Sequence, residues 1–132
     1  MLHVLLIEDN SADARIVREA IEASLVTVDV VIAHDGEHAL RVLTEFEFTP
    51  DVIFLDLNLP KCDGFQVLER SSPNEGSSVI VLTSSTNPAD IKRAQELGAR
   101  EYIIKSLDLD SFVEAIRGAL ERWTRDAAKR LV

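Results

Sequence analysis

Residues 50–60 read Pro-Asp-Val-Ile-Phe-Leu-Asp-Leu-Asn-Leu-Pro, and this stretch predicts the centre of the fold. Positions 52–55 are apolar without polar alternation, which is typical of a strand in a parallel sheet with helices on both faces. The run stops at Asp56, and Asn58 and Pro60 follow shortly after it. The chain therefore leaves the strand in a loop at its carboxyl end, where open α/β sheets build their sites.

Three further apolar runs have the length and composition of strands, and each is followed directly by polar side chains. The run 2–7 is followed by Glu8 and Asp9, the run 79–82 by Thr83, and the run 101–104 by Lys105. In a parallel sheet the carboxyl ends of all strands meet at one edge. Together with Asp56, three carboxylates, one hydroxyl and one ammonium are therefore expected to gather there.

Composition predicts a single soluble domain that spans residues 1–132, with no second or output domain, since domains cluster at about 100–150 residues. The net charge of −9 argues against nucleic acid, because phosphate neutralisation requires clustered Lys and Arg. The single cysteine, Cys62, excludes an internal disulfide, and the sequence has no basic leader and no 18-residue apolar run. We therefore expect a cytoplasmic protein that does not bind a membrane.

Helical patterns alternate with the strand-like runs. Five strand–helix units with right-handed crossovers predict an α/β fold with a doubly wound, five-stranded parallel sheet. Among the common strand orders, 2-1-3-4-5 places the first strand beside the third, so that Asp56 faces Glu8 and Asp9. The expected strands are 2–7, 28–33, 51–56, 79–82 and 101–104, and the expected helices are 11–23, 36–46, a short one from 64, 88–97, and 109 to the end of the chain.

Local signals mark several helix ends. Asn87 followed by Pro88 is typical of a cap with proline at the first helical position. Gly98 predicts a left-handed residue after the fourth helix. The last helix has two candidate caps, Asp108 and Ser106, and both residue types accept backbone hydrogen bonds at helix starts.

Several short motifs follow one another along the chain. They are Leu-Leu-Ile-Glu-Asp-Asn at 5–10, Asp-Gly at 35–36 with Ala-Leu at 39–40, Phe-Leu-Asp-Leu-Asn-Leu-Pro at 54–60 with Asp-Gly at 63–64, Val-Leu-Thr-Ser at 81–84, Leu-Gly-Ala at 97–99 and Tyr-Ile-Ile-Lys at 102–105. Together they resemble a response regulator receiver domain, the CheY-like phosphoacceptor module of two-component signalling, over nearly the whole chain. The segment 56–63, and Lys105 followed by Ser106, are most similar to the single-domain regulators associated with phytochrome-type kinases.

The resemblance implies that Asp56 accepts a phosphoryl group from a sensor histidine kinase, with at most weak self-dephosphorylation and no other enzymatic activity. It also implies Mg²⁺, held by Asp9, Asp56 and the backbone carbonyl of Asn58, with Glu8 acting mainly through water. The residues themselves favour a hard cation, because clustered carboxylates raise one another's pKa unless a cation neutralises them. Lys105 is expected to neutralise charge on the phosphoryl group.

The resemblance further implies a switch in which the Thr83 hydroxyl moves to the phosphoryl group and Tyr102 rotates into the space behind it. The face made by the fourth helix, the fifth strand and the fifth helix would then contact a downstream protein. An aromatic residue on a strand also often serves only in packing, and that reading of Tyr102 stays open. Most members of the family have proline after the site lysine, so Ser106 leaves the cis or trans state of the Lys105–Ser106 peptide open.

Three other functions compete with the phosphoacceptor switch. A scaffold whose site is intact but unused would signal without phosphorylation. An aspartyl-phosphate phosphohydrolase of the haloacid-dehalogenase type is disfavoured, because it needs a second acid two residues after the nucleophile, where this chain has Asn58. A flavin carrier is excluded, because Glu8 and Asp9 would repel the flavin phosphate. The sequence does not indicate the cognate kinase, its stimulus, the downstream target or the lifetime of the phosphate.

The last helix is longer than a small sheet requires. Its apolar pattern continues through Trp123, Ala127 and Leu131, beyond the expected core. Apolar residues left on a surface at helical spacing favour a partner, and a symmetric pair is the usual form. We therefore expect a homodimer through this helix, with a frayed helical tail as the alternative; whether dimerisation depends on phosphorylation is left open.

Overall fold

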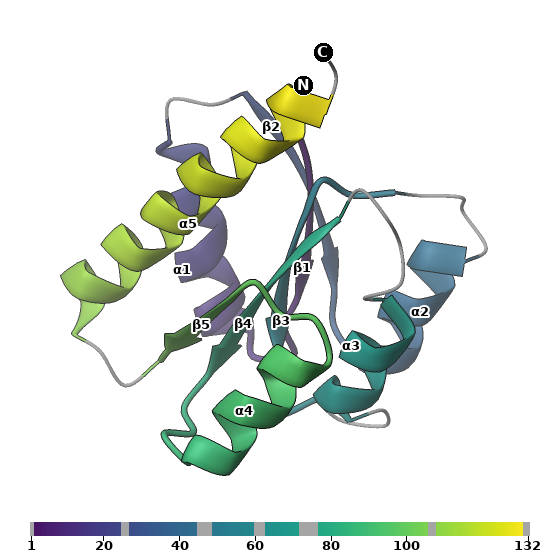
Figure 1. The fold of residues 1–132 in the computed structure, drawn as a ribbon. Coiled ribbons are helices and arrows are strands. Elements are labelled where there is room, and N and C mark those ends of the chain that lie inside the picture. The colour runs from purple at the N-terminus through teal and green to yellow at the C-terminus, as the bar shows by residue number, and fades with distance from the viewer. Residues whose placement is uncertain are drawn as a thin grey trace.

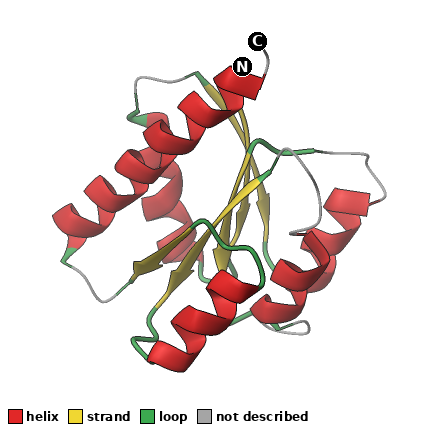
Figure 2. Cartoon of the chain, in the orientation of Figure 1, coloured by secondary structure: helices red, strands yellow, loops and turns green. Residues whose placement is uncertain are grey.

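The computed structural model describes residues 2–24, 27–44, 49–59, 63–71, 77–105 and 108–130, without the side chains of 71 and 125–130. In this part of the chain, five strands alternate with five helices (Figures 1 and 2). The elements are β1 (Leu2–Ile7), α1 (Ser11–Glu22), β2 (Val28–Ala33), α2 (Gly36–Thr44), β3 (Val52–Asp56), α3 (Gly64–Ser71), β4 (Ser78–Thr83), α4 (Pro88–Glu96), β5 (Glu101–Ile104) and α5 (Leu109–Arg130).

All neighbouring strands run parallel, in the order β2-β1-β3-β4-β5, which confirms the predicted topology. β3 lies in the middle, and all five of its residues are buried, as its unbroken apolar run predicts. The register of β1 and β3 pairs Ile7 with Leu55. The residues that follow this pair, Glu8 and Asp56, are consequently brought side by side at the carboxyl edge of the sheet.

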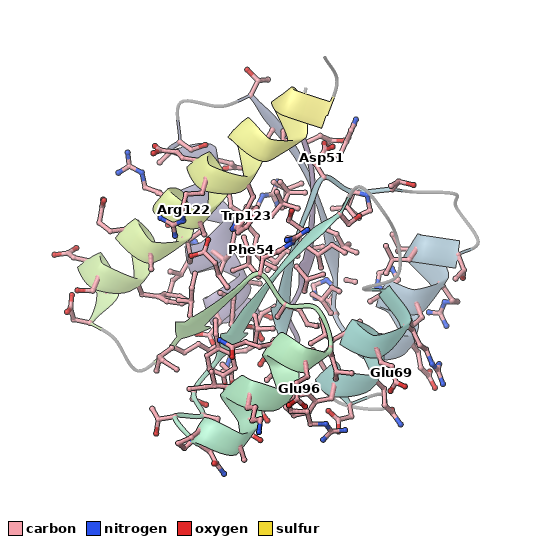
Figure 3. The ribbon with its side chains drawn as sticks, in the orientation of Figure 1. Asp51, Phe54, Glu69, Glu96, Arg122 and Trp123 are labelled. Atoms are coloured by element: carbon pink, nitrogen blue, oxygen red, sulfur yellow. The ribbon has the colours of Figure 1, made fainter. Side chains whose placement is uncertain are left out.

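Helices cover both faces of the sheet and enclose two separate cores. α1 and α5 pack on one face, while α2, α3 and α4 cover the other (Figure 1). β3 contributes to both cores because its side chains alternate: Phe54 faces α1 and α5, whereas Ile53 and Leu55 face the other layer. Figure 3 shows Phe54 in the middle of the molecule. None of the helices in the described ranges combines the length and apolarity that a membrane span requires.

The helix ends follow the local sequence signals. The side chain of Asn87 caps α4 by accepting a backbone hydrogen bond of 3.0 Å, and Pro88 occupies the first helical position. Gly98 adopts a φ of 106° directly after α4, as predicted for a residue in the left-handed region. At the start of α5 the carboxylate of Asp108 accepts the backbone N–H of Ser111 at 3.0 Å, so Asp108 supplies the cap.

Gly64 allows α3 to begin directly against the end of β3. Its N–H donates to the Leu57 carbonyl oxygen at 3.1 Å. A Cβ at this position would lie 2.4 Å from the Leu57 Cα and 2.8 Å from the Asp56 carbonyl oxygen, closer than atoms can approach. Asp63 precedes it and caps α3 by accepting the Phe65 N–H at 2.9 Å. The Asp-Gly pair therefore holds the start of α3 against Leu57, the residue that follows Asp56 at the end of β3.

The prediction that Trp123 lies beyond the core is wrong. Trp123 packs, partly buried, against the core under α5, and its indole N–H donates to a carboxylate oxygen of Glu101 at 2.5 Å. Arg122 donates to the same carboxylate, with its Nε at 3.1 Å. Figure 3 labels Arg122 and Trp123 on α5. Glu101 opens β5 and presents a carboxylate to α5, which the apolar pattern of the helix could not reveal. Ala127 and Leu131 lie outside the described side chains, so the homodimer stays a prediction.

Candidate functional site

Three carboxylates meet at the carboxyl edge of the sheet. Glu8 and Asp9 follow β1, Asp56 ends β3, and one oxygen atom of each lies within 4.8 Å of the others. Glu8 is fully buried, Asp56 is 3% exposed, and Asp9 faces solvent. The adjacency of β1 and β3 at the point where the strand order reverses produces this cluster, as expected for sites in doubly wound sheets.

Lys105 brings an ammonium group into the cluster. Its Nζ donates to Glu8 Oε1, to Asp56 Oδ2 at 3.2 Å and to Asp13 Oδ2 at 3.1 Å. Only 14% of the lysine side chain is exposed. The backbone N–H of Lys105 donates to the Thr83 carbonyl oxygen at 2.7 Å, which extends the pairing of β4 with β5 past the end of β5. That extension directs the lysine toward the site.

Asp13 is a site residue that the sequence did not reveal. It lies in the first turn of α1, where acidic residues are common because a negative charge is favourable at a helix N-terminus. An aspartate at this position therefore did not indicate a functional role. The usable signal is the short connection 8–10, which starts α1 directly above the carboxyl edge of the sheet. An acid in that first turn can reach a lysine at the end of β5.

The site carries more negative charge than Lys105 balances. Burial raises the pKa of Glu8 to about 8, and the nearby Asp56 carboxylate acts in the same direction against the lowering effect of Lys105. Burial alone would lower the pKa of Lys105, but the hydrogen bond and charge of Glu8, with the charge of Asp56, raise it above its usual value. The lysine is therefore charged at neutral pH, and a further cation would favour the ionised form of Glu8.

The donor atoms around the cluster suit a hard divalent cation. An open cavity of about 380 Å³ reaches the Asp9 and Asp56 carboxylates, and its lining also includes Asn58 and Ser84. Carboxylate and carbonyl oxygens are the ligands that Mg²⁺ prefers, together with water. The backbone N–H of Asn58 donates to Asp56 Oδ1 at 3.0 Å, which fixes the orientation of that carboxylate. The residues present thus fit the predicted metal site.

Thr83 and Tyr102 meet at the same loop beside the cluster. Thr83 ends β4, is 1% exposed, and its hydroxyl oxygen accepts the backbone N–H of Ser85 at 3.2 Å. The hydroxyl of Tyr102 donates to the carbonyl oxygen of Ser85 at 3.2 Å. Burial raises the pKa of Tyr102, so the phenol stays protonated and remains a donor at neutral pH. Ser85 therefore links the hydroxyl of Thr83 to the phenol of Tyr102 on β5.

Comparison with known proteins agrees with this geometry. The family model of the response regulator receiver domain matches residues 4–117. The chain belongs to the response regulator receiver family. Among its curated relatives, Rcp1 of Synechocystis sp., a response regulator, is 36% identical over 128 residues, which cover 91% of this chain and 87% of the relative. The probable methanogenesis regulatory protein FilR2 of Methanothrix harundinacea is 35% identical over 127 residues, covering 91% and 82%.

Solved receiver structures have the same fold. The Mn²⁺-bound form of response regulator Rcp1 superposes with a TM-score of 0.83 at 35% identity, covering 93% of this chain and 94% of the other. The phosphorylated cyanobacterial phytochrome response regulator RcpA gives 0.84 at 37% identity, with the same coverage. The predicted family, the CheY-like fold and the likeness to phytochrome-associated regulators are confirmed.

Proposed function

We propose that this receiver is a phosphoacceptor switch: Asp56 accepts a phosphoryl group from a phosphohistidine of a sensor histidine kinase, and the phosphorylated form contacts a downstream protein. The observation that carries this proposal is the Asp56 carboxylate, buried between the Lys105 ammonium and the Glu8–Asp9 pair. A buried acid cluster with an excess of negative charge costs stability. Such a cost is common at functional sites, where charges are arranged for chemistry rather than for folding.

In the proposed reaction, a carboxylate oxygen of Asp56 attacks the phosphorus atom of the phosphohistidine. A P–O bond forms, the P–N bond breaks, and its electron pair goes to the imidazole nitrogen. Most of the catalysis in such transfers is positioning and charge stabilisation. Lys105 donates to the phosphoryl oxygens, while the Asn58 N–H holds the acceptor carboxylate in place. Attack of water on the phosphorus atom later releases phosphate and restores the Asp56 carboxylate.

Asp9, Asp56 and the backbone carbonyl of Asn58 would hold Mg²⁺, with Glu8 acting mainly through water. When bound, the cation would neutralise negative charge on the phosphoryl group and on the acid cluster. The similar regulator Rcp1 has a Mn²⁺-bound form, which supports a divalent cation in this proposal. In this chain the oxygen donors of the three clustered acids support the same assignment.

The signal would leave through the face of α4, β5 and α5. We infer that the Thr83 hydroxyl exchanges its Ser85 contact for a phosphoryl oxygen, and that Tyr102, bonded to the same Ser85, repositions with the loop. Such a change is a population shift between two packings. A homodimer through α5 and a phytochrome-type kinase complete the proposal; the likeness to RcpA, a cyanobacterial phytochrome response regulator, supports the kinase class.

Intact-mass spectrometry tests the proposal. The protein is incubated with Mg²⁺ and acetyl phosphate, beside Asp56→Asn and a matched control, Asp51→Asn. Asp51 precedes the same strand but accepts the His3 N–H at the opposite edge of the sheet (2.9 Å; Figure 3 labels Asp51). The expected result is one phosphoryl group on the wild type and on Asp51→Asn, and none on Asp56→Asn.

Two other outcomes would overturn the switch in different ways. An unmodified wild type, with acetyl phosphate consumed no faster than in buffer, would favour the phosphorylation-independent scaffold. Steady turnover of varied phosphate esters, abolished in Asp56→Asn, would favour a phosphohydrolase. Phosphotransfer from a panel of purified histidine kinases then identifies the cognate kinase by its rate.

A further inference from the structure

We propose that α4 opens from the sheet as a unit of its own, and that two polar side-chain contacts determine how often it does so. The inference concerns the unmodified protein. It bears on the proposed function only because α4 belongs to the face through which the signal would leave. Its starting point is the packing of α4, which differs from that of the other helices.

Little apolar surface of α4 is buried. Ala94 is its only buried residue, and all nine residues of this helix belong to the described part of the chain. The side chain of an alanine is a single methyl group, whereas α1 buries four residues, among them Val17 and Ile21. Segments with few buried apolar contacts are the first to open in native proteins. The burial pattern therefore predicts that α4 is only weakly attached to the sheet.

The side of α4 next to α3 is not closely packed. Figure 1 shows α4 at the end of its layer, with α3 as its neighbour. An open cavity of about 550 Å³ lies between the two helices, and its lining includes Leu59 and Phe65 together with Asp90 and Arg93 of α4. Apolar packing at this place consequently contributes little to holding α4 in position.

Two side-chain contacts join α4 to its surroundings. In its first turn, the carboxylate of Asp90 accepts the Ser85 hydroxyl at 2.6 Å, and Ser85 is itself held because Tyr102 donates to its carbonyl oxygen. About one turn later, the guanidinium of Arg93 lies 4.2 Å from the centre of the Phe65 ring on α3. A hydrogen bond to an ionised acceptor and a cation over an aromatic face are both favourable. These contacts supply attachment that apolar burial does not.

Other contacts of α4 maintain its helical shape but not its position. Asn87 caps its start, and the Ala99 N–H donates to the Ala94 carbonyl oxygen at 3.0 Å just after its end. Lys92 and Glu96 form an ion pair of 4.0 Å within the helix; Figure 3 labels Glu96. These contacts link α4 to itself or to its adjoining residues, so they do not fix it to the sheet or to α3.

Amide hydrogen exchange, followed residue by residue by NMR in metal-free protein, tests the inference. In the wild type, the amides of α4 should exchange faster than those of the buried strand β3. Their exchange should also depend only weakly on low concentrations of urea, because opening of one helix exposes little surface. Exchange in β3 should depend on urea steeply, since it requires unfolding of the whole domain.

Removal of either contact should accelerate exchange in α4. Asp90→Asn is expected to do so about tenfold, the scale of one hydrogen bond to a charged group. Arg93→Met keeps an unbranched side chain, loses the cation, and should accelerate exchange about threefold, the scale of an exposed cation–π contact. The two contacts are independent, so the double variant should show the product of the two factors.

Matched variants separate the two contacts from general effects on the helix. Glu96→Gln and Lys92→Met remove charges that pair only within α4, and each should change its exchange by less than about twofold. Ser85→Ala leaves the charge of Asp90 at the helix start, yet should accelerate exchange as Asp90→Asn does. Combining Ser85→Ala with Asp90→Asn should add little, because both break the same hydrogen bond. Phe65→Leu should likewise resemble Arg93→Met.

Two results would overturn the inference. Equal exchange rates and equal urea dependence in α4 and β3 of the wild type would show that α4 opens only when the whole domain unfolds. Acceleration in Asp90→Asn and Arg93→Met that is no larger than in the Glu96 and Lys92 controls would show that other contacts hold the helix. Both results leave phosphoryl transfer to Asp56 untouched, and a failure of that transfer would leave the exchange pattern of α4 unchanged.

Discussion

Each end of β5 carries a cluster in which a basic side chain meets acid, yet the two clusters differ in burial and in charge balance. At the start of the strand, Glu101 accepts from the guanidinium of Arg122 and the indole N–H of Trp123. Arg122 is 55% exposed there, and one acid meets one base. Just past the end of the strand, Lys105 is 14% exposed and shared by three carboxylates.

This difference separates a contact that stabilises the fold from one arranged for chemistry. An exposed, balanced ion pair contributes about 0.2–1 kcal/mol, and here it helps to hold α5 on the edge of the sheet. A buried and unbalanced cluster carries a desolvation penalty that its single ammonium does not fully offset. Binding of a cation would relieve that penalty, so the unfavourable energy at the site favours metal binding.

The largest effect is expected when the base of each cluster is removed. Lys105→Met removes the ammonium that the buried acids Glu8 and Asp56 share and should lower the free energy of unfolding by about 3 kcal/mol in metal-free buffer. Arg122→Met, the matched change at the other end of β5, should lower it by at most about 1 kcal/mol. Urea unfolding with and without Mg²⁺ measures both. If both variants lose the same free energy of unfolding, or if Mg²⁺ changes the stability of Lys105→Met no more than that of the wild type, the two clusters do not differ as described.

Neutralising an acid should change the free energy of unfolding in opposite directions at the two ends of β5. Asp56→Asn relieves repulsion with Glu8 and Asp9, and we expect the metal-free protein to gain about 1 kcal/mol of stability. Glu101→Gln weakens the acceptor for Arg122 and should cost about 1 kcal/mol. Thermal unfolding in the presence of a chelator compares the two. A loss of stability in Asp56→Asn would show that the acid cluster stabilises the fold.

The pH dependence of stability has a defined sign, set by the raised pKa of Glu8. Glu8 has a pKa of about 8 in the folded protein, above its ordinary 4.5. Between these values the folded state binds a proton that the unfolded state lacks, so stability falls as the pH rises through this window. The contribution is complete below pH 4.5 and lost above about 8. Unfolding of wild type and Glu8→Gln without metal between about pH 6 and 9 should show a steeper decline for the wild type; parallel curves would contradict the raised pKa.

Salt should produce the smallest effect, and only at the exposed end. In about 1 M KCl the Debye length falls to about 3 Å, so the Arg122–Glu101 pair is screened while the buried Lys105 contacts are not. The stability difference between wild type and Arg122→Met should shrink by a few tenths of a kcal/mol. The difference for Lys105→Met should stay nearly constant. A difference that shrinks equally in both would mean that Lys105 is accessible to solvent ions.

The fold could be predicted from the sequence because four of the five strands have two signals, an apolar run and a polar residue directly after it. The run 52–55 predicted a fully buried central strand, and Asp56 marked its end. Neighbouring parallel strands share one carboxyl edge, so their terminal residues had to meet there. The structure brings Glu8, Asp9, Asp56 and Lys105 to that edge, while their chemical roles stay proposals.

Contacts that cross between elements without periodicity could not be predicted from the sequence. In the sequence, Asp13 is an ordinary acidic residue in a first helical turn. Only the position of α1 over the carboxyl edge of the sheet shows that its carboxylate accepts from Lys105. Trp123 was predicted to lie on the surface from the apolar pattern of α5 alone. That pattern gives no information about Glu101 on β5, which accepts the indole N–H of Trp123. The Lys105–Ser106 peptide and Cys62 lie outside the described residues, so the conformation of that peptide stays open.

One measurement tests the central claim most directly: the acyl phosphate is trapped by borohydride reduction after treatment with Mg²⁺ and acetyl phosphate, and the modified residue is located by peptide mass spectrometry. We predict reduction at Asp56 alone, lost when the donor or Mg²⁺ is omitted. Modification at Glu8, Asp9 or a histidine, or an Asp56 that stays unmodified while the donor is consumed, would contradict the phosphoacceptor role.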